Sequence, residues 1–462
     1  MGSRVTGIGQ TASGSLYSLS LANNVIKVIN AGDLQVISEV PGIRPISPSS
    51  FERRRGDLPV ALLHPRKQHL YLSADTDDAG TIQGYDFWLD QHALRLDAAP
   101  ISRTRMVGKD QREVLQSKIT HSTFTFDGSW LITVDEWDDL YSLDESTATE
   151  TNLKFWAWNG RNWEILTKIE EPHGIRRRVL ALTGQRCLNE CATLGTTGDI
   201  KVWRLLDSAS NNSASGVWSL HRHIGSHNPN VSRSEGSLVY SVDGSLLIAS
   251  AGIELLIIDT SSGHVVRCIH LGRPTSSVSI LGRQLLCLHP GIPMLSAWDI
   301  PTGQATFSER LNGRCSILAV NHSRSTFAFS TSNSSTSRSS ITISQLIGTE
   351  KLDLAQIALD SFAAVLLSAE FPDFSGYVVI DQLGQITCLA PEHAGSQSST
   401  DVGSHHGSTL SPPSSLRKRD VGKGFEISHQ KDFRAHDIRT IVGISETIDL
   451  AVLYESIVEK IV

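Results

Sequence analysis

The chain has 462 residues, of which 40% are hydrophobic and 19% are charged, and its formal net charge is −7 at pH 7. This length exceeds one ordinary core, so the chain forms either one repeat-built domain or two or three smaller domains. The small negative charge excludes a protein coated with positive charge, so any RNA contact has to be local. Abundant glycine, rare methionine and the lack of long Glu/Lys/Ala-rich stretches favour an all-β fold.

The N-terminal residues contain no apolar signal-peptide core, and no run reaches membrane-spanning length, so we expect an intracellular protein without a membrane partner. The six cysteines form no CxxC pair and lie mostly within apolar runs, which predicts reduced, structural thiols. Cys187 and Cys191 could be half of a zinc site, but no second cluster with ligand spacing accompanies them. No cofactor is therefore expected.

Short apolar runs recur along the chain and are separated by turns of Gly, Asp, Asn or Ser. This pattern predicts a WD-repeat β-propeller, whose blades need about 40–45 residues and four antiparallel strands each. We assign residues 1–391 to the propeller and expect seven blades or, alternatively, eight. Within this range, residues 1–40 could instead be the last blade of an upstream propeller. The repeated units are clearest at 14–40, 128–169, 189–206, 244–271, 283–311 and 376–391.

The repeat signature is degenerate. The WD dipeptide occurs as Trp298-Asp299, while Trp203, Trp156 and Ile258 occupy the equivalent place in other units. No Gly-His element opens a repeat. A bulky residue on the third strand still packs between blades, and glycines such as Gly198 supply the backbone freedom that a tight turn requires.

After residue 391 the composition changes. Residues 392–424 are rich in Ser, Gly, Pro and His, and we expect a disordered linker that contains a basic run. Residues 425–462 form a C-terminal segment with a short amphipathic helix predicted over about 445–462, capped by Ser445. Such a helix docks either on its own ring or on a partner. Its apolar residues are Leu450, Leu453, Tyr454, Ile457, Val458 and Ile461.

The acidic stretch at 130–139 is the strongest candidate for chemistry. On a strand, Asp135 and Glu136 point to opposite faces, so they cannot flank one glycosidic bond. The acidic residues that follow have neither EF-hand spacing nor a nearby His pair. No catalytic motif of the common hydrolase, zinc-protease or nucleotide-binding kinds occurs either. The sequence therefore predicts a non-catalytic protein without a small-molecule substrate.

Basic runs suggest local contacts. Two lie in loops between predicted strands and are candidates for RNA or partner contact, while a third lies in the linker and is a candidate nuclear-import run. The alternative for each run is an ordinary solvated surface. The loop runs are Arg53, Arg54, Arg55, Arg176, Arg177 and Arg178, and the linker run is Arg417, Lys418 and Arg419 with Lys423.

Several of these segments resemble one known family. The segments at 127–139 and 150–173, together with the opening blades at 14–43 and 58–74 in the right order, are similar to a WD-repeat subunit of the UtpA (t-UTP) subcomplex of the small-subunit processome. That family is the U3 snoRNA-associated or WD repeat-containing protein seventy-five family. Its members carry two consecutive propellers, so the resemblance implies that this chain lacks most of the first.

The resemblance implies a nuclear and nucleolar scaffold for ribosome biogenesis. Such a protein joins other UtpA WD-repeat proteins, engages the U3 snoRNP and the 5′ external transcribed spacer of the pre-rRNA, and supports rRNA transcription and 18S rRNA processing. A second hypothesis is a WD-repeat adaptor of another complex, such as a ubiquitin ligase or a vesicle coat. A third is a propeller hydrolase, which requires catalytic groups assembled across blades.

Overall fold

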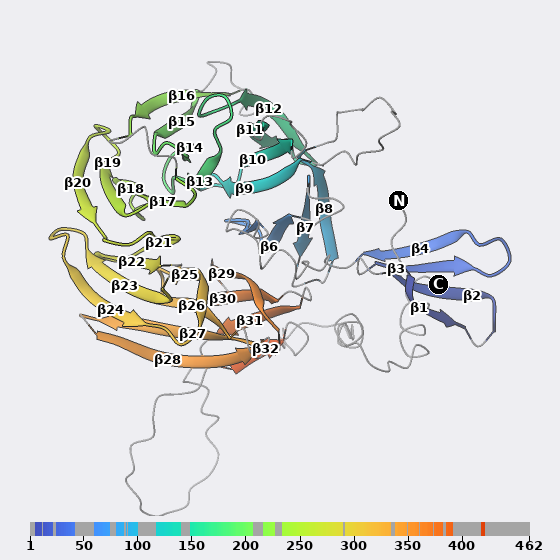
Figure 1. Ribbon diagram of the computed structural model, residues 1–462. Coiled ribbons are helices and arrows are strands. Elements are labelled where there is room, and N and C mark those ends of the chain that lie inside the picture. The colour runs from blue at the N-terminus through green and yellow to red at the C-terminus, as the bar shows by residue number, and fades with distance from the viewer. Residues whose placement is uncertain are drawn as a thin grey trace, which may run out of the picture.

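The ring of strands that dominates the protein closes through contacts between residues far apart in sequence. In the computed structural model, the first strands of successive four-stranded sheets contact one another, and β29 returns to contact β5. Figure 1 shows these seven sheets arranged around a common axis. The structure describes residues 5–11, 13–21, 25–41, 60–73, 80–86, 89, 91–99, 117–139, 148–206, 216–226, 233–289, 292–333, 338–348, 350–359, 361–372, 374–381, 385–390 and 417–420.

Each blade of the ring is an antiparallel sheet whose strands pair in chain order. In the first four blades the strands are β5 (Ala61–Leu63), β6 (His69–Ser73), β7 (Thr81–Asp86) and β8 (Gln91–Asp97); β9 (Lys118–Phe124), β10 (Trp130–Asp139), β11 (Ala148–Trp158) and β12 (Trp163–Glu170); β13 (Val179–Gly184), β14 (Glu190–Gly195), β15 (Ile200–Leu206) and β16 (Val217–Ile224); and β17 (Gly236–Tyr240), β18 (Leu246–Ala251), β19 (Glu254–Asp259) and β20 (Val265–His270).

The remaining three blades complete the circle. Their strands are β21 (Ser277–Leu281), β22 (Gln284–His289), β23 (Met294–Asp299) and β24 (Ala305–Arg310); β25 (Arg314–Asn321), β26 (Thr326–Asn333), β27 (Arg338–Ile347) and β28 (Glu350–Leu359); and β29 (Ala363–Phe371), β30 (Phe374–Asp381), β31 (Ile386–Ala390) and β32 (Arg417–Asp420). The described residues contain no helix able to cross a membrane.

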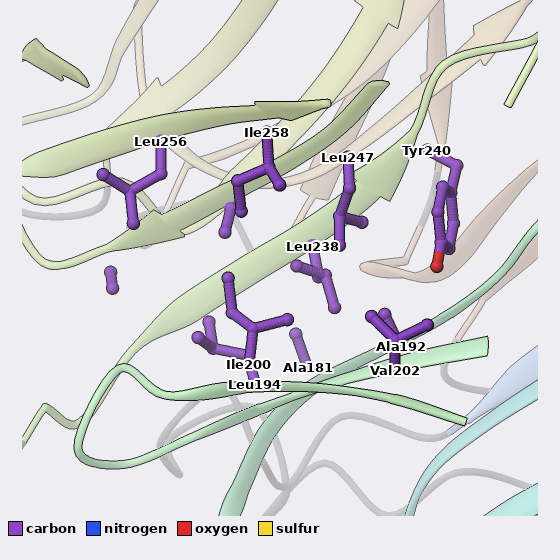
Figure 2. Packing of buried hydrophobic residues seen from close by; sticks show 12 residues of the cluster. Ala181, Ala192, Leu194, Ile200, Val202, Leu238, Tyr240, Leu247, Leu256 and Ile258 are labelled. Atoms are coloured by element: carbon purple, nitrogen blue, oxygen red, sulfur yellow. The ribbon is translucent and has the colours of Figure 1, made fainter. Parts of the chain in front are cut away.

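Apolar side chains of neighbouring blades interlock and hold the ring together. Between the blades that begin with β13 and β17, Leu194 and Ile200 pack with Leu238 and Leu247, as Figure 2 shows. Each such fully buried side chain contributes roughly 1.5–3 kcal/mol of transfer free energy. A similar cluster includes Leu70 and the β29–β31 blade, so the same hydrophobic packing also closes the ring.

A recurrent bulge marks the position of the WD dipeptide. In the pairing of third and fourth strands, the register shifts just before Trp156, Trp203, Ile258 and Trp298. These are the four positions that the sequence places in equivalent sites, and the structure puts all of them on third strands. The same shift precedes Ile29 in the sheet described next, so that sheet is built like a ring blade.

The first sheet stands apart from the ring. It consists of β1 (Val5–Gln10), β2 (Leu16–Leu21), β3 (Val25–Asn30) and β4 (Val36–Pro41), paired in chain order. Figure 1 shows it to one side of the ring, coloured blue. The WD-repeat propeller fold predicted from the sequence is confirmed, and the choice between seven and eight blades resolves to seven in the ring.

The structure differs from the sequence-based expectation in two segments. Arg417, Lys418 and Arg419, expected in a disordered linker, lie on β32 and pair with β31. This strand takes its conformation from the edge of β31 and not from any apolar pattern of its own. The low-complexity composition of the Ser-rich stretch at 330–340 predicts a loop. In the structure, β26 continues through Asn333 and β27 begins at Arg338.

Candidate functional site

The acidic stretch on β10 is part of the blade and not an open catalytic cluster. Asp135 is buried, and its Oδ1 lies 2.7 Å from Nζ of Lys154 on the paired strand β11. The Asn152 side-chain amide donates to Oδ2 at 3.1 Å, and Lys154 Nζ also donates to the carbonyl oxygen of Ala98 at 2.7 Å. A carboxylate held by so many partners stabilises the junction between two blades.

Glu136 has a different set of neighbours. Its Oε2 lies 3.9 Å from Nε of Arg178, which belongs to the connection between β12 and β13. The two adjacent carboxylates therefore serve different contacts, and this geometry does not present them to one substrate atom.

A buried polar network takes the place of the Gly-His element, which the sequence analysis did not find. His173 Nδ1 lies 2.7 Å from Oδ2 of Asp199, and its Nε2 lies 2.9 Å from Oγ1 of Thr193. Trp203 Nε1 donates to the same Thr193 hydroxyl at 3.0 Å. The signal was present in the sequence as His173-Gly174, with the two residues in the opposite order, and sequence reasoning missed it.

The charge of this network is stabilised by its own hydrogen bonds. Burial alone raises the pKa of Asp199, but the hydrogen bond and charge of His173 and the Thr197 hydroxyl outweigh burial and hold that pKa well below its ordinary value. Gly198 adopts φ of 80°, which lets the turn bring Asp199 under His173. The network therefore fixes the β12–β13 connection to the β14–β15 turn.

Parts of the same network recur in two other blades. Trp156 Nε1 donates to Thr133 Oγ1 at 3.0 Å, and Trp298 Nε1 donates to Ser296 Oγ at 3.1 Å. His289 Nε2 lies 2.9 Å from that Ser296 hydroxyl. These indoles act as packing and hydrogen-bonding groups inside blades, so they are structural and not available as a binding surface.

The loop run of arginines lies where the sequence places it, between β12 and β13. Arg176 and Arg177 are exposed, and Arg176 has a φ of 60°, in the left-handed region. The backbone is held by bonds from Gly174 N to Glu171 O at 2.8 Å and from Arg177 N to Gly174 O at 3.2 Å. The backbone of this loop is therefore held in a defined conformation, and the side chains of Arg176 and Arg177 are exposed on it.

Other predicted site residues cannot be placed. The run Arg53, Arg54 and Arg55, the lysine Lys423 and the helix over 445–462 lie outside the described residues. Of the predicted import run, Arg417 to Arg419 lie on β32 as stated. That strand belongs to the β29–β32 blade and not to the blades joined by the β12–β13 loop.

The thiols and histidines fit structural or surface roles. Cys191, Cys287, Cys315 and Cys388 are buried and free, whereas Cys187 and Cys268 are exposed. Among the described residues, no group of three or more His, Cys, Asp or Glu side chains could hold a metal ion. His221 and His223 lie on strand β16.

The closed ring, the recurrent bulge between third and fourth strands and the His-Asp-Thr-Trp network define a WD-repeat β-propeller. Residues 62–337 match the family model described as the second beta-propeller of WD repeat-containing protein 75. The chain belongs to this family, and the match begins on β5, the first strand of the ring.

Two curated relatives show how much of a longer protein this chain represents. It is 24% identical over 373 residues to U3 small nucleolar RNA-associated protein 17 of Schizosaccharomyces pombe, covering 73% of this chain and 44% of that protein. It is 35% identical over 221 residues to NET1-associated nuclear protein 1 of Saccharomyces cerevisiae, covering 45% of this chain and 23% of that protein. The chain therefore spans less than half the length of these relatives.

Among solved structures, the chain aligns with a structure of U3-55K at a TM-score of 0.49 and 11% sequence identity. The alignment covers 71% of this chain and 88% of that one.

Proposed function

We propose that this protein is a non-catalytic scaffold in ribosome biogenesis that assembles the small-subunit processome on pre-rRNA. The observation that carries the proposal is the family match across the ring, which starts on β5 and runs to residue 337. A relative named for association with U3 small nucleolar RNA supports the same role. The partners are other UtpA WD-repeat proteins, the U3 snoRNP and the 5′ external transcribed spacer, and the site of action is the nucleolus.

The absence of enzymatic activity belongs to this proposal. It is supported by the contacts of the candidate carboxylates, since Asp135 is bound to Lys154 and Glu136 lies 3.9 Å from Arg178. A propeller surface that offers loops and edges for contact suits a scaffold. A WD-repeat adaptor of a ubiquitin ligase or vesicle coat is the second candidate, and a propeller hydrolase the third.

The proposal includes assignments for four parts of the chain. The sheet β1–β4 is the last blade of an upstream propeller, because it has the blade topology and the bulge before Ile29 but lies beside the ring. Arg176 to Arg178 contact RNA or a partner, and the run Arg417 to Arg419 with Lys423 acts in nuclear import. The helix predicted over 445–462 docks on a partner.

The proposal is tested by affinity purification of the tagged protein from growing cells, with mass spectrometry of partners and sequencing of bound RNA. We expect UtpA proteins, the U3 snoRNA and the 5′ external transcribed spacer to be enriched over a tagged, unrelated propeller. Recovery of ubiquitin-ligase or coat subunits in their place would select the adaptor instead.

Deleting residues 445–462 tests the proposed docking helix. We expect partner recovery to fall while the melting temperature of the purified protein stays unchanged. A lowered melting temperature with unchanged partner recovery would show that this segment packs on its own ring.

A further inference from the structure

Two identical tripeptides, Asn-Gly-Arg at 159–161 and at 312–314, contain the only Asn-Gly pairs of the sequence. An asparagine before glycine is prone to an intramolecular reaction, because glycine has no Cβ to hinder approach of its backbone nitrogen to the side-chain amide carbon. Since the same two residues follow both asparagines, their intrinsic reactivities are closely matched. A difference between them in the folded protein is therefore set by structure.

The first tripeptide lies in the turn between β11 and β12, where hydrogen bonds hold the asparagine side chain. Asn159 Oδ1 accepts hydrogen bonds from the backbone nitrogens of Arg161 and Asn162, each at 2.8 Å. Its Nδ2 donates to Oε1 of Glu164 at 2.5 Å. Movement of the amide carbon toward the nitrogen of Gly160 therefore disrupts hydrogen bonds at both ends of the amide.

The second tripeptide connects β24 to β25, and there the side chain is unrestrained. Asn312 is exposed, and among the residues that the structure describes, none forms a hydrogen bond with its side-chain amide. One backbone bond opposes the reaction, since Gly313 N donates to Leu311 O at 3.1 Å across a three-residue turn. Once that bond opens, the amide carbon of Asn312 can rotate toward Gly313 N without the loss of any other hydrogen bond.

We propose that Asn312 is a site of deamidation and isoaspartate formation, and that the contacts of Asn159 protect it from the same reaction. The nitrogen of Gly313 forms a bond with Cγ of Asn312 and gives up its proton. The bond from Cγ to Nδ2 breaks, and Nδ2 leaves with that proton as ammonia.

The product of this step is a five-membered succinimide, which water then opens. The water oxygen adds to one of the two ring carbonyl carbons, and the ring nitrogen takes up a proton as its bond to that carbon breaks. Cleavage of the new bond to Cγ gives aspartate, whereas cleavage of the original peptide bond gives isoaspartate. Neither step needs an oxidant, a reductant or a reactant other than water.

Isoaspartate formation alters a junction between two blades. The main chain then runs through Cβ and Cγ of residue 312, so the connection between β24 and β25 becomes one atom longer. This connection extends only from Leu311 to Gly313. Leu311 and Cys315, on either side of the site, are buried in the same hydrophobic cluster, so the longer connection disturbs their packing. The reaction goes beyond the proposed scaffold role and does not depend on it.

The test follows both sites in the purified full chain, which is incubated at mildly alkaline pH and physiological temperature. Peptides that contain each asparagine are quantified by mass spectrometry after peptic digestion at acidic pH. We expect Asn312 to react on the order of tenfold faster than Asn159. In concentrated urea the two rates should become equal, because both tripeptides then lack their folded contacts.

A variant at the first site tests whether its hydrogen bonds are protective. Glu164→Ala removes the acceptor of Asn159 Nδ2, and the exposed position of Glu164 makes the change compatible with folding. We expect the reaction at Asn159 to become about threefold to tenfold faster in this variant, while the rate at Asn312 stays unchanged.

Isoaspartate itself is measured by transfer of a labelled methyl group with isoaspartyl methyltransferase. Incubated Asn312→Gln should lose most of the labelling of the wild-type protein, because the longer side chain forms the corresponding ring far more slowly. Asn159→Gln is the matched control and should keep it. Equal rates at the two sites of the folded protein, or undiminished labelling of Asn312→Gln, would overturn the proposal. A faster reaction at Asn159 would also overturn it and show that the N–H groups bound to Oδ1 activate the amide.

Discussion

His173 Nδ1 and Asp199 Oδ2 lie 2.7 Å apart. This contact joins the β12–β13 connection, which leads into the blade, to the β14–β15 turn within the same blade. His173 is buried, and its second ring nitrogen is used by Thr193. Removal of the imidazole therefore leaves two buried polar groups without their partner, which costs more than the loss of one exposed contact.

We predict that His173→Ala lowers the free energy of unfolding by about 2–4 kcal/mol, because it leaves the Asp199 carboxylate buried without its partner. His223→Ala is a matched control, since His223 lies 3.8 Å from the same carboxylate but has a side chain that is 52% exposed. That control should change stability by less than about 0.5 kcal/mol. Urea unfolding monitored by tryptophan fluorescence measures both, and equal losses would contradict a structural role for the buried pair.

A second prediction concerns pH and His64. Burial, followed by the charge of Lys67, lowers the pKa of His64 to about 4. Its Nδ1 accepts hydrogen bonds from the backbone nitrogens of Arg66 and Lys67, which the protonated ring could not do. Because the pKa in the unfolded chain is near 6.5, the unfolded state takes up a proton first as the pH falls.

The stabilising contribution of His64 is thus complete above pH 6.5 and is lost progressively as the pH falls toward 4. We expect wild-type protein to lose on the order of 1 kcal/mol more stability than His64→Gln between pH 7 and pH 5. Urea midpoints at the two pH values measure this difference. His264→Gln serves as the control because the His264 side chain is exposed, and an equal effect of both variants would exclude a specific role for His64.

The sequence was sufficient for the fold because the evidence for it is local. Repeated apolar runs, Gly198 in its turn and the third-strand positions of Trp203 and Trp298 all depend on residues a few positions apart. The number of blades in the ring cannot be read from residues that are close together in the sequence. It depends on contact between β5 and β29, and β1–β4 follow the same pattern as a ring blade without joining the ring.

The internal contacts were harder to predict for the same reason. Asp135 and Lys154 meet only because β10 and β11 pair in a register that places Thr133 opposite Lys154. Two strands separated by a long acidic segment can pair in several registers, so the sequence indicated a strand there but not the ion pair.

The ion pair between Asp135 and Lys154 makes a third prediction. Lys154→Met should destabilise the protein by about 3–5 kcal/mol, because it leaves a buried carboxylate without its cation. The double variant Asp135→Leu/Lys154→Met should recover most of that loss, since it removes both charges. Thermal and urea unfolding of the single and double variants gives the coupling energy, and a double variant as unstable as the single one would contradict the assignment of Asp135 to the structural framework.

Gly128 provides the fourth prediction, because the turn that contains it lies against His64. Its φ is 70°, and a Cβ built at this position would lie 2.4 Å from Cε1 of His64. Gly160 is the matched control, since its φ is 96° and no atom lies within 4 Å of the corresponding Cβ. Both Gly→Ala changes incur the cost of a left-handed backbone, which is roughly 1 kcal/mol.

Only Gly128→Ala must also displace the buried imidazole. Since His64 is 4% exposed and packs with Phe124 at a ring-centroid distance of 5.0 Å, it cannot move without disturbing the core between two blades. We therefore expect Gly128→Ala to cost about 1–3 kcal/mol more than Gly160→Ala in urea unfolding. If the two variants proved equally stable, the contact between His64 and the β9–β10 turn would have to be looser than this packing indicates.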